Sequence, residues 1–306
     1  MSSLSTSFGG FFERSITRMN GLRNQIDRAQ TQIATGQRIE RGSHDPAAAA
    51  QLRVIDRRSR LNEAKQDNTA QLGQELGLAD RELGAVASLL QRARELAVSA
   101  ANDPIGSDGR TAIANELAQL GAELFTRANA AGPSGNPLFA GIGAGPAFIQ
   151  DAGGIVTYAG TAHVGSVPLA SGTAIERGLP GSQIFQFEVD GTPTDAFAVI
   201  GALAAALASG AGDPGAAARD ALGGLDAALD NVSRAQTILG TRMVWADMIQ
   251  AEQQNRAIDL AERRSELGDT QIAEAIVRLQ QTMTALEASQ SAFARVSGLS
   301  LFRVLS

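Results

Sequence analysis

The sequence predicts a mainly α protein with a long helical bundle, a terminal coiled coil formed by both chain ends and a small β-rich inserted domain. Apolar residues recur every three or four positions over most of the 306 residues, as in helices that pack on partner helices. Glycine, proline and short β-branched stretches gather instead in the middle of the chain. Only 4% of the residues are aromatic, which suits long helices with thin cores.

The two chain ends carry narrow apolar stripes. The C-terminal stripe predicts a helix that is capped by Asp269 or Thr270 and stops at Ser297-Gly298, and a similar stripe predicts a helix over residues 7–35. Two such stripes predict that the helices pair, either as an ordinary hairpin within one chain or as a layer of an assembly. The predicted assembly interface consists of Phe12, Met19, Ile26, Ile33, Ile272, Ile276, Leu279, Met283, Leu286 and Phe293.

Between the terminal helices the chain predicts a helical bundle. Asp45-Pro46 is a helix-start signal, because Asp caps free N–H groups and Pro is tolerated at the first helical position. The helix that follows is expected to end at Asn102-Asp103-Pro104, where proline disfavours helix in the residue before it. Further helices are predicted over residues 108–130, 196–207 and 216–267.

Residues 132–195 predict short strands. In particular, residues 183–189 form such a stretch, in which Phe185, Phe187 and Val189 alternate with polar residues, and Asp190-Gly191 is a hairpin-turn signal. The chain is therefore expected to form three domains. They are a terminal coiled coil (1–44 with 268–306), a helical bundle (45–131 with 212–267) and a β-rich outer insert (132–211).

Composition and charge exclude several classes of function. The net charge of −6 argues against nucleic acid as a partner. The longest apolar run, over residues 196–208, is too short to span a bilayer, so membrane insertion is not expected. There is no cysteine, which excludes disulfides and thiol chemistry. Residues 1–15 lack the basic and apolar segments of a Sec signal peptide, so export without a cleaved signal is expected.

No group of residues predicts catalysis. A two-histidine metal site at His44 and His163 is conceivable, although exposed or capping histidines are far commoner. We therefore expect no enzymatic activity, no catalytic residue, no cofactor and no metal. The basic residues Arg53, Arg57, Arg58, Arg60 and Lys65 alternate with acidic ones on a predicted helix, which indicates a solvated or intersubunit face.

Several segments resemble those of bacterial flagellins and the related hook-filament junction proteins. Residues 33–39 (Ile-Ala-Thr-Gly-Gln-Arg-Ile) and 43–48 (Ser-His-Asp-Pro-Ala-Ala) are similar to the N-terminal signature of that superfamily, and residues 89–102 and 281–305 are similar to its bundle and C-terminal segments. Residues 138–141 (Leu-Phe-Ala-Gly), Tyr158-Ala159-Gly160 and residues 179–185 resemble motifs of the junction branch. Pro137 and His44 depart from it, because an aromatic residue and an aspartate are usual there.

The resemblance implies an extracellular structural subunit of the bacterial flagellum, exported by the flagellar type III apparatus, that forms a junction ring between hook and filament. The implied partners are further copies of the chain, neighbouring hook-associated or flagellin subunits and an export chaperone. A flagellin that polymerises into the filament itself is the alternative within the superfamily. A carbohydrate-binding module in the β-rich insert, suggested by Tyr158 and Phe187, is a third hypothesis.

Overall fold

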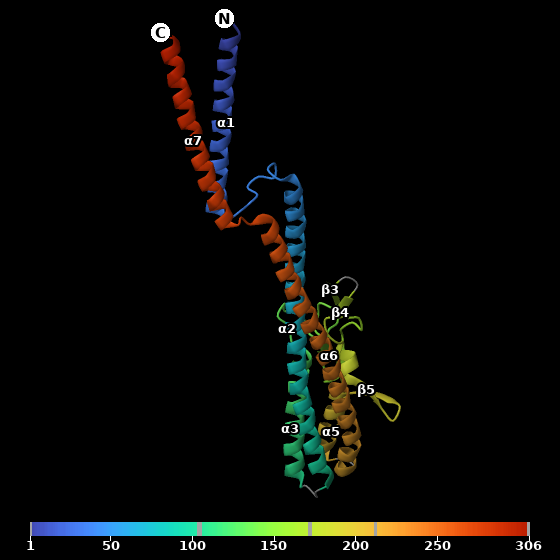
Figure 1. The fold of residues 1–306 in the computed structure, drawn as a ribbon. Coiled ribbons are helices and arrows are strands. Elements are labelled where there is room, and N and C mark those ends of the chain that lie inside the picture. Colours follow the sequence, from blue (N-terminus) through green and yellow to red (C-terminus); the bar gives the residue numbers. More distant parts are fainter. Residues whose placement is uncertain (1, 103–105, 171–172, 211–212, 305–306) are drawn as a thin grey trace. The chain divides into compact units, whose positions relative to one another are not determined.

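The computed structural model describes residues 2–102, 106–170, 173–210 and 213–304, and within them the chain is mainly helical (Figure 1). The helices are α1 (Ser2–Thr35), α2 (Pro46–Asn102), α3 (Ser107–Ala128), α4 (Gly181–Phe185), α5 (Ala196–Ser209), α6 (Pro214–Gly268) and α7 (Ile272–Val304). The strands are β1 (Phe148–Gln150), β2 (Val156–Tyr158), β3 (Ser166–Ala170), β4 (Thr173–Glu176), β5 (Gln186–Val189) and β6 (Thr192–Asp195). The predicted fold class is confirmed. None of the helices in these residues combines the length and the apolar character needed to cross a membrane.

The chain forms two compact units. We call Met1–Leu61 with Arg256–Ser306 the terminal unit, and Asn62–Asn255 the central unit. Helices α2 and α6 contribute residues to both. The three-domain prediction places a further boundary around residues 132–211, and that division stays a prediction. Buried residues from this stretch belong to the same hydrophobic cluster as those of the neighbouring helices.

In the terminal unit, α1 and α7 lie side by side and run in opposite directions (Figure 1). Backbone hydrogen bonds close the base of this helical hairpin: the Arg38 N–H donates to Gly268 O at 2.7 Å, and the Thr270 N–H donates to Gly36 O at 2.8 Å. The Arg38 guanidinium also donates to Leu267 O. Gly36 has a φ of 70°, the left-handed conformation that commonly ends a helix. The ends of α1 and α6 are therefore held together.

The start of α2 agrees with the sequence prediction. Asp45 Oδ1 accepts a hydrogen bond from the Ala48 N–H at 3.0 Å, which satisfies one of the free donors of the first turn. This bond, together with the Arg38 guanidinium 3.3 Å from Oδ2, lowers the pKa of the Asp45 carboxyl. The ionised carboxylate therefore stabilises the N-terminus of α2.

Helix α7 differs from the prediction at both ends. The Asp269 carboxylate accepts a hydrogen bond from the end of α6, and the buried Thr270 hydroxyl has no hydrogen-bond partner in the described chain. The prediction that either residue caps α7 is therefore wrong. The predicted stop at Ser297-Gly298 is also wrong, because the helix spans Ile272–Val304. A glycine inside a helix costs only about 1 kcal/mol relative to alanine, which the flanking turns offset.

The core of the central unit includes apolar faces of α2 and α6, whose residues recur every three or four positions as the sequence predicts. Each fully buried leucine or valine contributes about 1.5–3 kcal/mol relative to an exposed one, so packing offsets the cost of the glycines in α2. The buried residues on this face of α2 include Leu72, Leu76, Ala79, Leu83, Val86, Leu90, Ala93 and Ala97. Buried residues of α6 that lie seven positions apart on one face are Leu225, Val232, Leu239 and Ala246.

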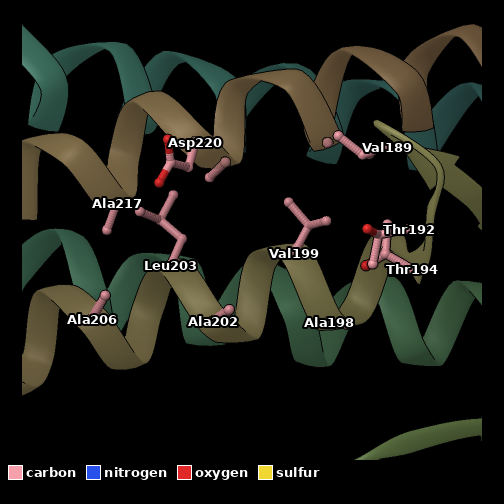
Figure 2. A pocket seen from close by; sticks show the side chains of 12 residues that line it. Val189, Thr192, Thr194, Ala198, Val199, Ala202, Leu203, Ala206, Ala217 and Asp220 are labelled. Atoms are coloured by element: carbon pink, nitrogen blue, oxygen red, sulfur yellow. The ribbon is translucent and has the colours of Figure 1, made fainter.

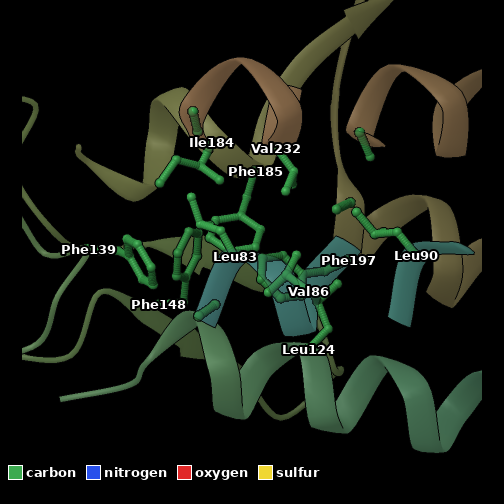
Figure 3. Packing of buried hydrophobic residues seen from close by; sticks show 14 of the residues in the cluster. Leu83, Val86, Leu90, Leu124, Phe139, Phe148, Ile184, Phe185, Phe197 and Val232 are labelled. Atoms are coloured by element: carbon green, nitrogen blue, oxygen red, sulfur yellow. The ribbon is translucent and has the colours of Figure 1, made fainter. Parts of the chain in front are cut away.

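An aromatic cluster lies where the strands meet the helices (Figure 3). The Phe148 ring of β1 is centred 5.2 Å from those of Tyr158 and Phe185 and 5.1 Å from that of Phe197. Phe139 meets Phe185 edge-on at 6.1 Å. Aromatic pairs at such distances stabilise a core beyond their buried area. The cluster joins β1, β2, α4 and α5 in one packed region.

The strands form three antiparallel two-stranded sheets, β1-β2, β3-β4 and β5-β6, within the described residues. The predicted hairpin turn is confirmed, because Asp190 and Gly191 have φ angles of 51° and 76° and join β5 to β6. The predicted strand over residues 183–189 is only partly correct. Its first half belongs to helix α4, because burying Ile184 and Phe185 in the core outweighs their β propensity.

Polar contacts fasten the β3-β4 hairpin to α6. Gln253, which is only 4% exposed, donates from Nε2 to Leu169 O at 3.1 Å, and its Oε1 lies 3.2 Å from the Thr69 hydroxyl of α2. Arg242 donates to the Glu176 carboxylate of β4. Buried polar groups of this kind require partners, so they fix how the hairpin sits on the helices.

Candidate assembly interface

The predicted interface residues of α1 share one face. Phe12, Met19, Ile26 and Ile33 are all half-buried, and they lie seven residues apart along the helix. The Phe12 ring meets the ring of Phe293 in α7 edge-on, with the centroids 5.2 Å apart. These four side chains therefore lie on the face of α1 that packs on α7.

The predicted interface residues of α7 divide into two groups. Three are half-buried and in line with the α1 contact: Leu279, Leu286 and Phe293. We call the other three the outer row, and they are exposed by 51%, 41% and 44%: Ile272, Ile276 and Met283. At 100° per residue the outer row spans only about 40° of the helix circumference. The pairing of α1 with α7 thus leaves an apolar strip uncovered.

Two residues of the contact between α1 and α7 were not predicted from the sequence. Ala275 and Thr282 are the buried residues of α7 among those whose burial the structure describes, 272–297, and they lie on the same face as Leu279 and Leu286. The Thr282 hydroxyl donates to Arg278 O at 2.7 Å within the helix, so it can be buried without loss of a hydrogen bond. Their seven-residue spacing is a signal for this face, but alanine and threonine did not stand out among larger apolar residues.

A groove of about 590 Å³ lies in the central unit between α5 and the first turns of α6, beside the β5-β6 hairpin (Figure 2). We call it the alanine groove, because Ala198, Ala202, Ala206 and Ala217 line much of it. Asp220 is a charged side chain in its wall. The groove can therefore take apolar side chains, and a cation at its edge.

For the other candidate sites, the described residues either lack the groups that a ligand would need or make contacts within the protein. No cluster of three or more His, Asp or Glu side chains there could hold a metal. The Tyr158 hydroxyl bonds to Phe139 O and Thr161 O, and Tyr158 and Phe187 both pack on the core. These contacts explain the two aromatic residues without a carbohydrate ligand.

Comparison with known proteins agrees with the helical architecture. Residues 14–144 match the bacterial flagellin N-terminal helical region. The chain is 28% identical over 289 residues to flagellar hook-associated protein 3 of Escherichia coli K12, covering 89% of this chain and 90% of that protein.

Solved structures have the same fold. The structure of flagellar hook-associated protein 3 from Legionella pneumophila matches with a TM-score of 0.62 at 14% identity, over 70% of this chain and 98% of that one. A structure of the flagellar junction protein FlgL from the same organism gives 0.59 at 15% identity, over 72% and 100%. The chain is thus similar to the bacterial flagellin N-terminal helical region over residues 14–144 and, over most of its length, to flagellar hook-associated protein 3.

Proposed function

We propose that this protein is a structural subunit of the bacterial flagellum that joins the hook to the filament, as a junction ring held by packing of its terminal helices. The similarity to hook-associated protein 3 favours this role over that of a filament flagellin. The outer row of α7 supports the proposed packing between subunits, because it is an apolar strip that pairing with α1 leaves exposed.

The free energy available from the outer row suits a ring of many subunits. Full burial of an Ile or Met side chain contributes about 1.5–3 kcal/mol, and these three are already about half covered, so a contact contributes about 2–4 kcal/mol. Such a contact alone corresponds to only millimolar affinity. In a closed ring each subunit contacts two neighbours, so weak contacts reinforce one another.

In this role the protein is exported without a cleaved Sec signal, through the flagellar type III apparatus, and works outside the cell. Its partners are further copies of itself, neighbouring hook-associated or flagellin subunits and an export chaperone. The role requires no catalysis, cofactor or metal. A thin pair of terminal helices fits it, because such a pair is marginal alone and is stabilised by assembly.

The test replaces Ile276 and Met283 together with aspartate in the bacterium that makes this protein. Both side chains are exposed, so α1 and α7 still pair, but charge in an apolar contact is costly to desolvate. We expect cells that export the variant yet carry hooks without filaments and release flagellin into the medium. Electron microscopy of the cells and analysis of the medium give the readout.

The matched control is Gln280→Asp with Thr284→Asp, which adds the same charge at exposed polar positions of α7. Circular dichroism of the purified chains checks that helix content is unchanged. Normal filaments on cells with Ile276→Asp and Met283→Asp would contradict the role of the outer row. Long uniform filaments of the purified wild-type protein in a salting-out buffer would instead indicate a filament flagellin.

A further inference from the structure

The two units of the chain carry opposite net charge. The terminal unit has 16 Lys and Arg residues against 11 Asp and Glu, a net charge of +5, whereas the central unit has 10 against 21, a net charge of −11. The overall −6 conceals this asymmetry. Because complementary potentials steer and orient association, the terminal unit of one copy is attracted to the central unit of another.

The alanine groove is an apolar surface on the acidic unit. Its wall includes Asp220, which is exposed and forms no ion pair with any described residue. Glu188 and Asp190, also exposed, flank the groove residue Val189 on the β5-β6 hairpin. Figure 2 shows Asp220 and Val189 on the same side of the groove, above the alanines of α5. The groove therefore suits an apolar helix face with basic side chains on its edges.

The terminal unit presents a helix face of this kind on α2. Val54 and Leu61 are exposed by 42% and 58%, and they lie seven residues apart, on one line along the helix. Arg57 and Arg58 lie on either side of that line, at about −60° and +40° from Val54. Neither arginine pairs with an acidic residue within the described ranges. We call residues 54–61 the basic segment.

The dimensions of the two surfaces agree. Val54 and Leu61 are about 10.5 Å apart along the helix axis, and Ala198 to Ala206 extend the groove over about 12 Å of α5. We propose that the alanine groove of one copy binds the basic segment of a second copy, with its arginines beside Asp220. This inference rests on the proposed function. The contact joins two different surfaces, so it propagates from copy to copy, as a ring requires.

Disulfide cross-linking tests this contact, because the natural chain has no cysteine. Cells of the source bacterium would co-express two full-length variants, one with Leu61→Cys and one with Ala198→Cys or Ala206→Cys. A disulfide forms only if the two Cα atoms come within about 7 Å. Leu61 is at one end of the basic segment, so we expect a mixed disulfide in assembled flagella with one of the two groove variants, which also gives the direction of binding.

The matched control pairs Leu61→Cys with Asp247→Cys, on an exposed face of α6 outside the groove. A mixed dimer several-fold above this control supports the contact. A yield no higher than the control with both groove variants overturns it. If the protein is present in the flagella without the cross-link, the junction role stands and this contact is wrong, whereas absence of the protein from flagella overturns both.

Charge reversal provides a second readout. Asp220→Lys should reduce the cross-link yield several-fold, because it puts a cation beside Arg57 and Arg58 of the neighbouring copy. Combining it with Arg57→Asp and Arg58→Asp on the other copy should restore the yield. Asp247→Lys, the matched control, should leave the cross-link yield unchanged. An unchanged yield with Asp220→Lys would contradict the proposed placement of the arginines.

Discussion

Replacing Gly181 with alanine tests the packing of the aromatic cluster. A Cβ at this position would lie 2.6 Å and 2.8 Å from Cε2 and Cζ of Phe148, closer than side chains approach in folded proteins. The Phe148 ring cannot move aside easily, because it is only 2% exposed and is packed by Tyr158, Phe185 and Phe197. Overpacking of this kind lowers the free energy of unfolding by about 1–3 kcal/mol.

A double-mutant cycle identifies the cause. Phe148→Ala should cost about 3–5 kcal/mol, because it leaves a cavity in a closely packed core. In that background the methyl group of Gly181→Ala no longer meets the ring. The two changes together should therefore cost about 1–3 kcal/mol less than the sum of the single changes.

Urea unfolding followed by circular dichroism measures the four free energies of the cycle. Gly201→Ala is the control, since it lies in helix α5 and its added methyl group would have no neighbouring atom within 4 Å. It should raise stability slightly and add independently to Phe148→Ala. Additive costs for Gly181→Ala and Phe148→Ala would refute the packing inferred between them.

Two further predictions concern hydrogen bonds. Gln253→Ala should lower the free energy of unfolding by about 2–4 kcal/mol, because it leaves the Leu169 carbonyl unpaired and removes buried apolar atoms. Thr69→Val, measured in the same urea titrations, should lower the free energy of unfolding by less. Equal losses for the two variants would contradict this account. The lowered pKa of Asp45 means that its contribution to the start of α2 is present above about pH 4 and is lost as the pH falls through the folded-state pKa. Hydrogen exchange at the Ala48 amide should therefore accelerate in acid in the wild-type chain but not in Asp45→Ala, and an identical acid response in both would contradict the cap.

The elements that could be predicted from the sequence are those that local patterns decide. The helices follow from apolar spacing, the start of α2 follows from Asp45-Pro46, and the β5-β6 turn follows from Asp190-Gly191. Each of these signals acts over a few residues, through a cap, a backbone conformation or a repeat. The terminal helical pair was predictable for the same reason, because both stripes persist over several turns.

Two predictions proved wrong because another part of the structure outweighs a local signal. Residues 183–189 have the β propensity of a strand, yet Ile184 and Phe185 belong to α4 and are buried in the core. The glycine at position 298 resembles a helix stop, yet α7 continues past it. Burial in the core decides the first case, which periodicity does not reveal, whereas in the second the flanking helical turns offset the cost of one glycine.

By itself the sequence determined the fold class, the main helices and the apolar stripes of the terminal helices. Only the tertiary structure decided which apolar residues of α7 face α1, because the outer row and the half-buried residues are both apolar and lie next to each other on the helix. The small side chains of Ala275 and Thr282 are buried there, which lets the helices approach closely, while Ile276 and Met283 remain exposed. The alanine groove likewise exists only because α5, α6 and the β5-β6 hairpin meet in the folded chain.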